Sequence, residues 1–234
     1  MKITLLTGRT FDFAQELGFA IKTVKSSSAR RLTLRIDEKE RIPVLSIPKY
    51  CSNRKALAFV EDHRDWIQNM LARLPEKNSF ASGTTFSLFG QTVTLIHNPN
   101  QRGTSFEENK LYIGGQPEFL HRSTIDFIKK YTEQKLSEMS LNIAQKLNCN
   151  IHSISIKDTK SRWGSCSNRG NINYNWRIAF APLEVIEYLV CHEVSHLVHP
   201  NHSQDFWACV ASICPHHRQS RHWLKVKGKT LYSY

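Results

Sequence analysis

The chain has 234 residues, of which 40% are hydrophobic and 10% aromatic, so it can bury a core of ordinary size. This composition excludes an intrinsically disordered chain, and the length allows one large domain or two small ones. The formal net charge of +12 suits an anionic partner such as a nucleotide or nucleic acid. It equally suits a merely basic protein, because no dense Lys/Arg tract occurs.

The six cysteines include no C-x-x-C pair, and a chain of this length does not need disulfides to fold. The apolar run after Met1 is too short for a signal peptide, and no stretch approaches membrane-spanning length. We therefore expect a cytoplasmic protein with reduced thiols and no membrane partner.

The first half of the chain has the alternating pattern of short strands, with one helix among them. Ser52 or Asn53 can cap that helix, which runs to Leu71. The segment Gly114–Pro117 then breaks the pattern, so we expect a β-rich N-terminal domain with one helix over 1–115 and a second domain over 116–234. Strands are predicted at residues 2–6, 19–24, 32–36, 44–47, 85–88, 92–96 and 110–113.

The second half is predicted to be mainly helical, which makes the whole chain an α+β protein. Helical periodicity covers residues 118–147, and residues 151–157 and 171–178 read as two strands joined in a β-hairpin by a turn rich in Gly, Ser and Asn. A core-facing helix starts at Pro182 and is expected to end at Pro200. Two more helices are expected, from about Ser203 and over 215–226.

The helix that starts at Pro182 contains a motif with chemical meaning, His192-Glu193-x-x-His196. Residues four apart lie on one face of a helix, so both imidazoles can reach one Zn²⁺ while Glu193 takes a proton from the activated water. Glu193 falls inside the apolar stripe of this helix, where a carboxylate is costly to bury without a task. The alternative is a pair of structural histidines with a solvent-seeking glutamate, and it is weakened by further histidines downstream.

Several residues are candidates for a third metal ligand, because no Glu follows Glu193. The best is His202, since Pro200 ends the helix and the turn that follows can bring this imidazole back beneath the metal. A metzincin is disfavoured, because His199 stands at their glycine position and no Met follows. Asp205 suits the N-terminus of the next helix better. The remaining candidates are His199, His216, His217 and His222.

Together the motifs of the chain resemble the YgjP-like metallopeptidase family, a group of minimal zincins similar to the SprT and WLM groups. The resemblance implies a zinc-dependent hydrolase with His192, His196 and His202 as zinc ligands and Glu193 as catalytic base, in a zincin-like domain over 116–234. The motifs that carry it are Lys160-Ser161-Arg162-Trp163-Gly164-Ser165-Cys166, Asn175-Trp176-Arg177, His192-Glu193-x-x-His196, Asn201-His202-Ser203, Phe206-Trp207, the run Ala29–Ile36 and Phe89-Gly90.

The predicted hairpin precedes the motif helix and is expected at the active-site cleft. A strand at the rim of such a cleft can pair with the backbone of an extended peptide. Arg162 and Trp163 are candidates for contacting substrate there, as an anion-binding group and as the wall of a pocket. The alternative is that Trp163 packs in the core and that Arg162 pairs with Asp158.

We therefore predict a zinc-dependent hydrolase, most simply a metallopeptidase that acts on a peptide or protein. A second hypothesis keeps the metal and changes the bond to a nucleotide phosphoanhydride, with Lys160, Arg162 and Arg169 binding phosphates. A third is a nucleic-acid-associated protease or binding module, in which residues 1–115 bind the nucleic acid.

Overall fold

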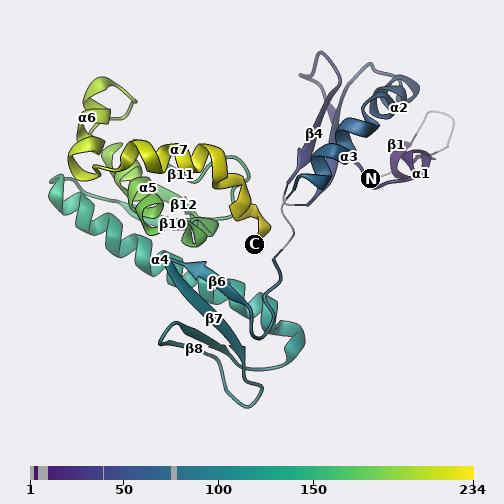
Figure 1. Cartoon of the computed structure of the whole chain (residues 1–234). Coiled ribbons are helices and arrows are strands. Elements are labelled where there is room, and N and C mark those ends of the chain that lie inside the picture. Colours follow the sequence, from purple (N-terminus) through teal and green to yellow (C-terminus); the bar gives the residue numbers. More distant parts are fainter. Residues whose placement is uncertain (1–2, 5–9, 39, 75–77) are drawn as a thin grey trace. The chain divides into compact units, whose positions relative to one another are not determined.

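The computed structural model describes residues 3–4, 10–38, 40–74 and 78–234, and it contains two compact units, Met1–Glu76 and Lys77–Tyr234 (Figure 1). The mixture of small sheets and helices confirms the predicted α+β class. This division falls after residue 76, whereas the sequence predicts a boundary after residue 115. The sheet formed by residues 85–113 belongs to the second unit because it shares a hydrophobic core with the helices that follow it. None of the helices in the described ranges has the length and apolarity needed to cross a bilayer.

The first unit is a three-stranded sheet with two main helices. The strand order is β3-β5-β4, with β3 (Lys22–Ser26) parallel and β4 (Thr33–Asp37) antiparallel to β5 (Ile42–Pro48). Helices α2 (Asn53–Asp62) and α3 (Arg64–Ala72) follow, and their buried Val60 and Ile67 pack with Leu45 and Ile47 of β5. The remaining elements are β1 (Ile3–Thr4), β2 (Thr10–Phe11) and α1 (Phe13–Leu17).

Two predictions for this unit need correction or fall outside the described residues. The single helix expected up to Leu71 is two helices, because His63 leaves the helical conformation with φ −109° and ψ 13°. Its start is as predicted, since the Ser52 side chain caps α2 by accepting a hydrogen bond from the Lys55 amide at 3.3 Å. The strand expected at residues 2–6 lies mostly outside the described residues.

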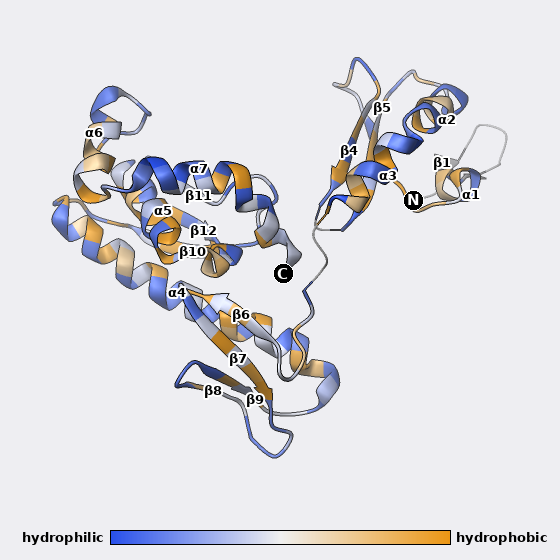
Figure 2. Cartoon of the chain, viewed as in Figure 1, coloured by the Kyte–Doolittle hydropathy of each residue, from blue (hydrophilic) through white to orange (hydrophobic). Residues whose placement is uncertain are grey.

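The second unit opens with a four-stranded sheet of order β6-β7-β9-β8, whose inner strands β7 (Gln91–His97) and β9 (Lys110–Ile113) are parallel. The apolar residues of β7 and β9 stand out in Figure 2. Leu95 and Ile113 are fully buried in one core with Ile128 of the long helix α4 (Leu120–Lys146). The outer strands are β6 (Thr85–Leu88) and β8 (Thr104–Glu107), and β8 was not predicted from the sequence.

Helix α4 buries one residue in every four along its whole length, and because an α-helix has about 3.6 residues per turn this stripe winds gradually around the helix. The short 3-10 helix η1 (Pro117–Phe119) leads into it. Three positions in the stripe are hydroxyl residues that satisfy their own hydrogen bonds. Thr124 and Thr132 donate to carbonyls one turn earlier, and the Ser140 hydroxyl lies 2.9 Å from that of Tyr174. The stripe consists of Leu120, Thr124, Ile128, Thr132, Leu136, Ser140 and Ala144.

A small sheet of order β10-β12-β11 lies between α4 and the motif helix in the sequence. Strands β10 (Ser153–Lys157) and β12 (Asn171–Asn175) were expected to form the hairpin, but they pair in parallel. The antiparallel partner of β12 is the short strand β11 (Gly164–Cys166), which lies inside the segment expected to be a turn. The hairpin therefore exists, between β11 and β12.

The motif helix α5 (Leu183–Ser195) follows the 3-10 helix η2 (Trp176–Phe180) and packs against α4 in the core. It ends before Pro200, with His196 as its C-terminal cap. Helix α6 (Gln204–Ile213) starts as predicted, since Ser203 caps it by accepting from the Phe206 amide at 3.3 Å. Helix α7 (His217–Lys227) and the 3-10 helix η3 (Gly228–Ser233) complete the unit.

The two ends of the second unit are hydrogen-bonded to each other. The Asn78 amide donates to the Ser233 carbonyl at 2.7 Å, and the Asn78 side chain donates to the Ser233 hydroxyl at 3.1 Å. Next to this contact, the Tyr234 ring stacks on Phe180 with 3.8 Å between ring centroids and packs on Phe80 at 5.8 Å. Tyr234 thus covers the edge of the core that contains Phe80 and Phe180.

Candidate metal centre

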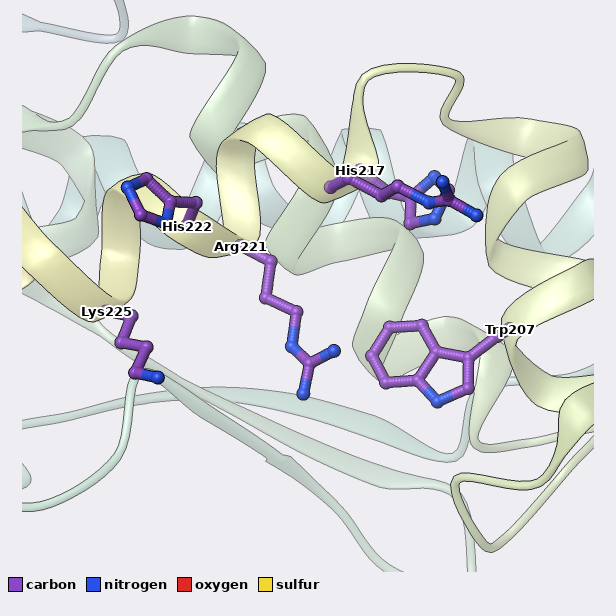
Figure 3. A pocket seen from close by; sticks show the side chains of 6 residues that line it. Trp207, His217, Arg221, His222 and Lys225 are labelled. Atoms are coloured by element: carbon purple, nitrogen blue, oxygen red, sulfur yellow. The ribbon is translucent and has the colours of Figure 1, made fainter.

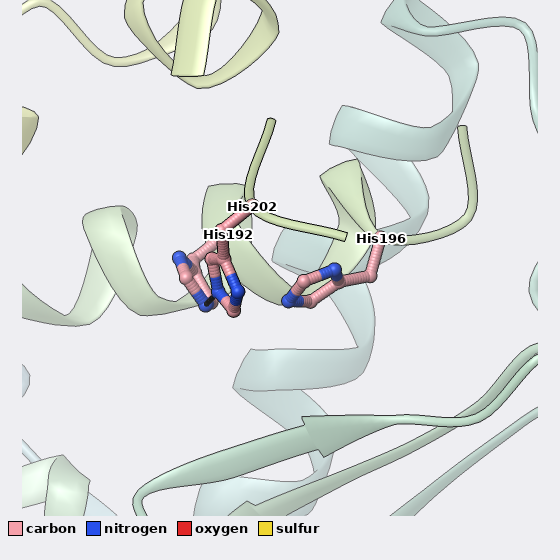
Figure 4. A group of neighbouring side chains, drawn as sticks. All are labelled: His192, His196 and His202. Atoms are coloured by element: carbon pink, nitrogen blue, oxygen red, sulfur yellow. Dashed lines mark hydrogen bonds between the residues drawn. The ribbon is translucent and has the colours of Figure 1, made fainter. Parts of the chain in front are cut away.

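Three histidine rings converge at the C-terminal end of α5 (Figure 4). His192 and His196 lie one helical turn apart, with 4.9 Å between ring centroids. His202 comes from the connection between α5 and α6, and its ring lies 5.0 Å from His192 and 4.7 Å from His196. One nitrogen of each ring lies within 4.8 Å of the others.

The spacing of these nitrogens fits a tetrahedral metal ion. Nε2 of His192 and Nε2 of His202 are 3.2 Å apart. Two imidazole nitrogens that each lie 2.0–2.1 Å from one tetrahedral Zn²⁺ are separated by about 3.3–3.4 Å. The donor set is also suitable, because neutral imidazole is a common ligand of zinc and of several other divalent transition metals.

Neighbouring groups orient two of the rings so that Nε2 faces the shared centre. The His196 Nδ1 proton is donated to the backbone carbonyl of His199 at 3.2 Å, which leaves the lone pair on Nε2. Nδ1 of His192 lies 3.5 Å from the Tyr188 hydroxyl, one turn earlier on α5. The carbonyl partner fixes the tautomer of His196 that a metal site needs, and the hydroxyl partner helps to orient the His192 ring.

Aromatic residues at the start of α6 support the cluster from one side. The Phe206 ring is fully buried and lies 4.5–5.0 Å from the rings of all three histidines. The neighbouring Trp207 ring lies 5.7 Å from His202 at an interplanar angle of 28°. The capped N-terminus of α6 therefore holds the connection that carries His202.

Burial favours the neutral form of His192 and His196, which is the form that binds a metal ion. The pKa of His192 falls to about 3, first because its ring is buried and then because positive charge on the neighbouring His196, His202 or Arg221 side chain would repel a second proton on this ring. Burial is also the main cause of the lowered pKa of His196. Little proton competition at these two rings is expected near neutral pH.

Glu193 lies beside the cluster with only 4% of its surface exposed. Burial raises the pKa of its carboxyl group to about 8, and the positive charge of Arg162 opposes this shift. The carboxylate lies directly against the backbone of Gly164 in β11. A Cβ atom added at Gly164 would be 2.7 Å from both Cγ and Cδ of Glu193, so glycine is what allows the strand to approach.

Arg162 and Trp163 lie just before β11. Arg162 is exposed, and the carboxylate of Asp158, its predicted partner, binds Nη1 of the buried Arg177 at 2.5 Å. Trp163 is half-buried and packs on the Tyr232 ring at 5.1 Å. Contact of either side chain with a substrate stays a prediction.

The other ligand candidates lie elsewhere. His216 contacts the Glu184 carbonyl at 3.1 Å and Glu187 at 3.5 Å, and His217 contacts the Cys214 carbonyl at 3.1 Å. His199 contributes its backbone carbonyl, as described above. Asp205 is exposed in the first turn of α6, and His222 is exposed on α7. Among the described residues, the one cluster of three or more potential ligands consists of His192, His196 and His202.

Sequence reasoning missed two contributors to the site. Tyr188 precedes His192 by four residues, and this helical spacing is the signal that could have found it. The contact of Gly164 with Glu193 joins segments far apart in sequence, so no local pattern indicates it.

Comparison with known proteins gives a family and a set of solved structures. Among the structures are the metallopeptidase zymogens abylysin of Pyrococcus abyssi and jannalysin of Methanocaldococcus jannaschii, both 20% identical to the chain over 39% of its length. The matches cover 95% and 97% of those chains, with TM-scores of 0.36 and 0.34. No curated protein matches the chain. The model of the family described as YgjP-like, metallopeptidase domain, matches residues 30–227, and the chain therefore belongs to this family of metal-dependent hydrolases.

Proposed function

We propose that this protein is a zinc-dependent peptidase, in which His192, His196 and His202 bind the metal and Glu193 is the general base. The observation that carries the proposal is the convergence of three oriented imidazoles beside a buried carboxylate. Three neutral imidazoles leave one tetrahedral position for water or substrate, which is the arrangement of a catalytic zinc site.

When bound, the metal would supply Lewis-acid chemistry, which makes water a stronger nucleophile near neutral pH and polarises the carbonyl under attack. Glu193 takes the proton from the attacking water on its carboxylate and passes it to the nitrogen of the leaving amine. Burial raises the pKa of this carboxyl group to about 8 in the metal-free protein, and the positive charge of a bound metal ion would lower it again, toward the range in which a general base works near neutral pH. Gly164 holds the carboxylate in place from the side of β11.

The peptide would bind along β11. Among the described residues this strand pairs only with β12, so its other edge is open to an extended backbone. Arg162, whose charge acts on the Glu193 carboxyl group, would then lie near the developing oxyanion. Trp163 would wall the neighbouring position. Both roles are proposals that the position of these residues beside β11 supports.

The metal assignment is tested by elemental analysis of protein purified without added ions. We expect near-stoichiometric zinc in the wild type and a loss of most of it in His202→Ala, since one of three ligands is gone. The matched control is His199→Ala, which removes an imidazole from the same connection but keeps the backbone carbonyl that orients His196. Equal zinc in His202→Ala and wild type would exclude His202 as a ligand.

The role of Glu193 is tested by hydrolysis of a peptide library followed by mass spectrometry. Glu193→Gln should retain zinc and lose activity by about 10²–10⁴-fold, the usual contribution of a general base. Turnover at the wild-type rate by the zinc-loaded variant would refute the mechanism. A nucleotide panel assayed in parallel for phosphate release separates this reaction from phosphoanhydride hydrolysis, for which the exposed Lys160, Arg162 and Arg169 are the candidate phosphate ligands.

A further inference from the structure

A cavity lies between α6 and α7 (Figure 3). Its volume is about 470 Å³, which is within the range of sites for small ligands or single side chains with their flanking backbone. One residue of α6 and five of α7 line it: Trp207, His217, Arg218, Arg221, His222 and Lys225.

The cavity is strongly positive. Three of the lining residues are permanent cations, and none of the described lining residues is acidic. Within the described part of the chain, Arg218, Arg221 and Lys225 form no ion pair. Helix α7 is among the most hydrophilic segments in Figure 2. Cations that converge without a protein counter-charge favour a bound anion.

Trp207 joins this cavity to the metal centre. The Arg221 guanidinium lies over the Trp207 indole, 4.5 Å from its ring centroid, and the same indole contacts His202 at 5.7 Å and His192 at 5.9 Å. The histidines and the Arg221 guanidinium are therefore separated by two contacts, one from histidine to indole and one from indole to guanidinium. An extended peptide covers this distance with about three residues, because each adds about 3.3 Å.

We propose that this pocket, defined by Trp207, Arg218, Arg221 and Lys225, binds a carboxylate of the peptide substrate within about three residues of the scissile bond. The inference rests on the proposed peptidase function and adds a substrate class, namely acidic peptides. The carboxylate belongs to an Asp or Glu side chain or to the peptide's own C-terminus. The indole provides a flat wall for the methylene groups of an acidic residue, and Arg221 provides a fork that matches a carboxylate.

A peptide fits these observations better than a nucleic acid. The cations are confined to two turns of one helix and surround one cavity, whereas a polyphosphate backbone needs positive charge along an extended groove. The direct link to a peptidase centre through Trp207 also favours a group carried by the substrate itself.

Binding is measured by calorimetry on the full chain in its zinc-loaded Glu193→Gln form, so that peptides are not cleaved. The probes are peptides cleaved by the wild type, with Glu or Gln at each of the three positions on either side of the scissile bond, and with a free or amidated C-terminus. At one position Glu should bind about tenfold more tightly than Gln, as expected for a charge-assisted hydrogen bond. A preference for the free C-terminus instead would support the pocket and identify the other carboxylate as its ligand.

Variants assign the preference to the pocket. Adding Arg221→Gln should abolish the difference between Glu and Gln peptides, and Arg221→Lys should restore part of it. The matched control is Lys227→Gln, which removes one charge from the same helix outside the cavity and should leave the preference unchanged. The ratio of kcat/KM values for Glu and Gln peptides should change in parallel in the enzyme with Glu193 intact.

Two results would overturn the inference. Equal affinity for Glu, Gln and amidated peptides that are all hydrolysed would exclude a carboxylate pocket and leave the peptidase function intact. Tight, Arg221-dependent binding of a twelve-residue oligothymidylate with no preference among the peptides would assign the pocket to nucleic acid. If the zinc-loaded wild type hydrolyses no peptide at all, the proposed function fails, and this outcome is recognised before any pocket variant is made.

Discussion

The Glu193 carboxyl group lies in the apolar stripe of α5, where burial raises its pKa to about 8 from the ordinary value of 4.5. A buried carboxylate of this kind destabilises the fold whenever it is ionised, because the unfolded chain solvates the charge fully. The same property that suits Glu193 to proton transfer therefore has a measurable effect on stability.

We predict that metal-free Glu193→Gln protein is more stable than the metal-free wild type, and that the difference grows with pH. Below about pH 4.5 the carboxyl group is protonated in both the folded and the unfolded state, so the cost is absent. Between about pH 4.5 and 8 the unfolded chain releases the proton first, so the wild type loses stability as pH rises, in total on the order of a few kcal/mol. Thermal unfolding in a chelator at pH 5 and pH 8 measures this effect.

Glu184→Gln is the control for this experiment, because Glu184 is exposed in the first turn of the same helix. Its difference in Tm from the wild type should not grow between pH 5 and pH 8. A constant difference for Glu193→Gln over this range would mean that Glu193 titrates near its ordinary value.

Part of the site could be predicted from single residues. The grouping of His192 and His196 follows from helical spacing alone, and the proximity of His202 follows from the short connection that contains Pro200 and leads to Ser203. The cationic pocket could not be predicted, because Trp207 and Arg221 lie on different helices and meet only after α6 and α7 have packed. The sequence predicted His217 and His222 on a helix over 215–226 and named them as candidate metal ligands, but it gave no indication that they line a cavity.

At the level of elements, the fit of strand β11 against helix α5 depends on Gly164. We predict that Gly164→Ala lowers kcat/KM by about ten- to a hundredfold, because the new methyl group would push the Glu193 carboxylate out of position. Zinc content should stay at the wild-type value, since the nearest atoms to the new methyl group all belong to Glu193 and not to a histidine. Peptide hydrolysis and elemental analysis together check this prediction.

The neighbouring substitution Ser165→Ala is a suitable control. Successive residues of a strand face opposite sides, so the Ser165 side chain points away from Glu193 and lies 3.4 Å from the Asn173 side chain. Wild-type activity in Gly164→Ala, or an equal loss in Ser165→Ala, would contradict a specific role for the glycine.

The success of element prediction depended on where the apolar residues lie. Helices α4 and α5 bury regular stripes, so their periodicity is visible in the sequence. Strand β8 is exposed at both of its ends and has only partly buried residues between them, so it lacks an alternating signal. Strand β11 has three residues and was hidden in a polar segment, and this is why the wrong pair of strands was assigned to the hairpin.

At the scale of the whole molecule, a domain boundary after residue 76 and one after residue 115 predict different behaviour for fragments of the chain. We expect residues 77–234 to unfold in one cooperative transition and to bind zinc, because this unit contains the sheet β6–β9, helix α4 and all three histidines. Residues 116–234 should be largely unfolded, since they lack the part of the shared core that strands β6, β7 and β9 supply. Circular dichroism, thermal unfolding and elemental analysis of both fragments provide the measurement.

A folded, zinc-binding 116–234 fragment would support the boundary at residue 115 and contradict the larger unit. The fragment comparison also bears on the predicted N-terminal domain. If residues 77–234 retain peptide hydrolysis, then the role of the first unit lies outside the chemical step, and nucleic-acid binding by that unit becomes a separate question.

The hydrogen bonds between Asn78 and Ser233 have a consequence for how the protein is made. This contact joins residues separated by 155 positions, so the second unit cannot close until the ribosome has added almost all of it. The first unit precedes it and can fold while synthesis continues. Until Tyr234 is synthesised, Phe80 and Phe180 lack the ring that packs on them in the folded unit. The growing chain therefore exposes an aromatic surface to which chaperones can bind.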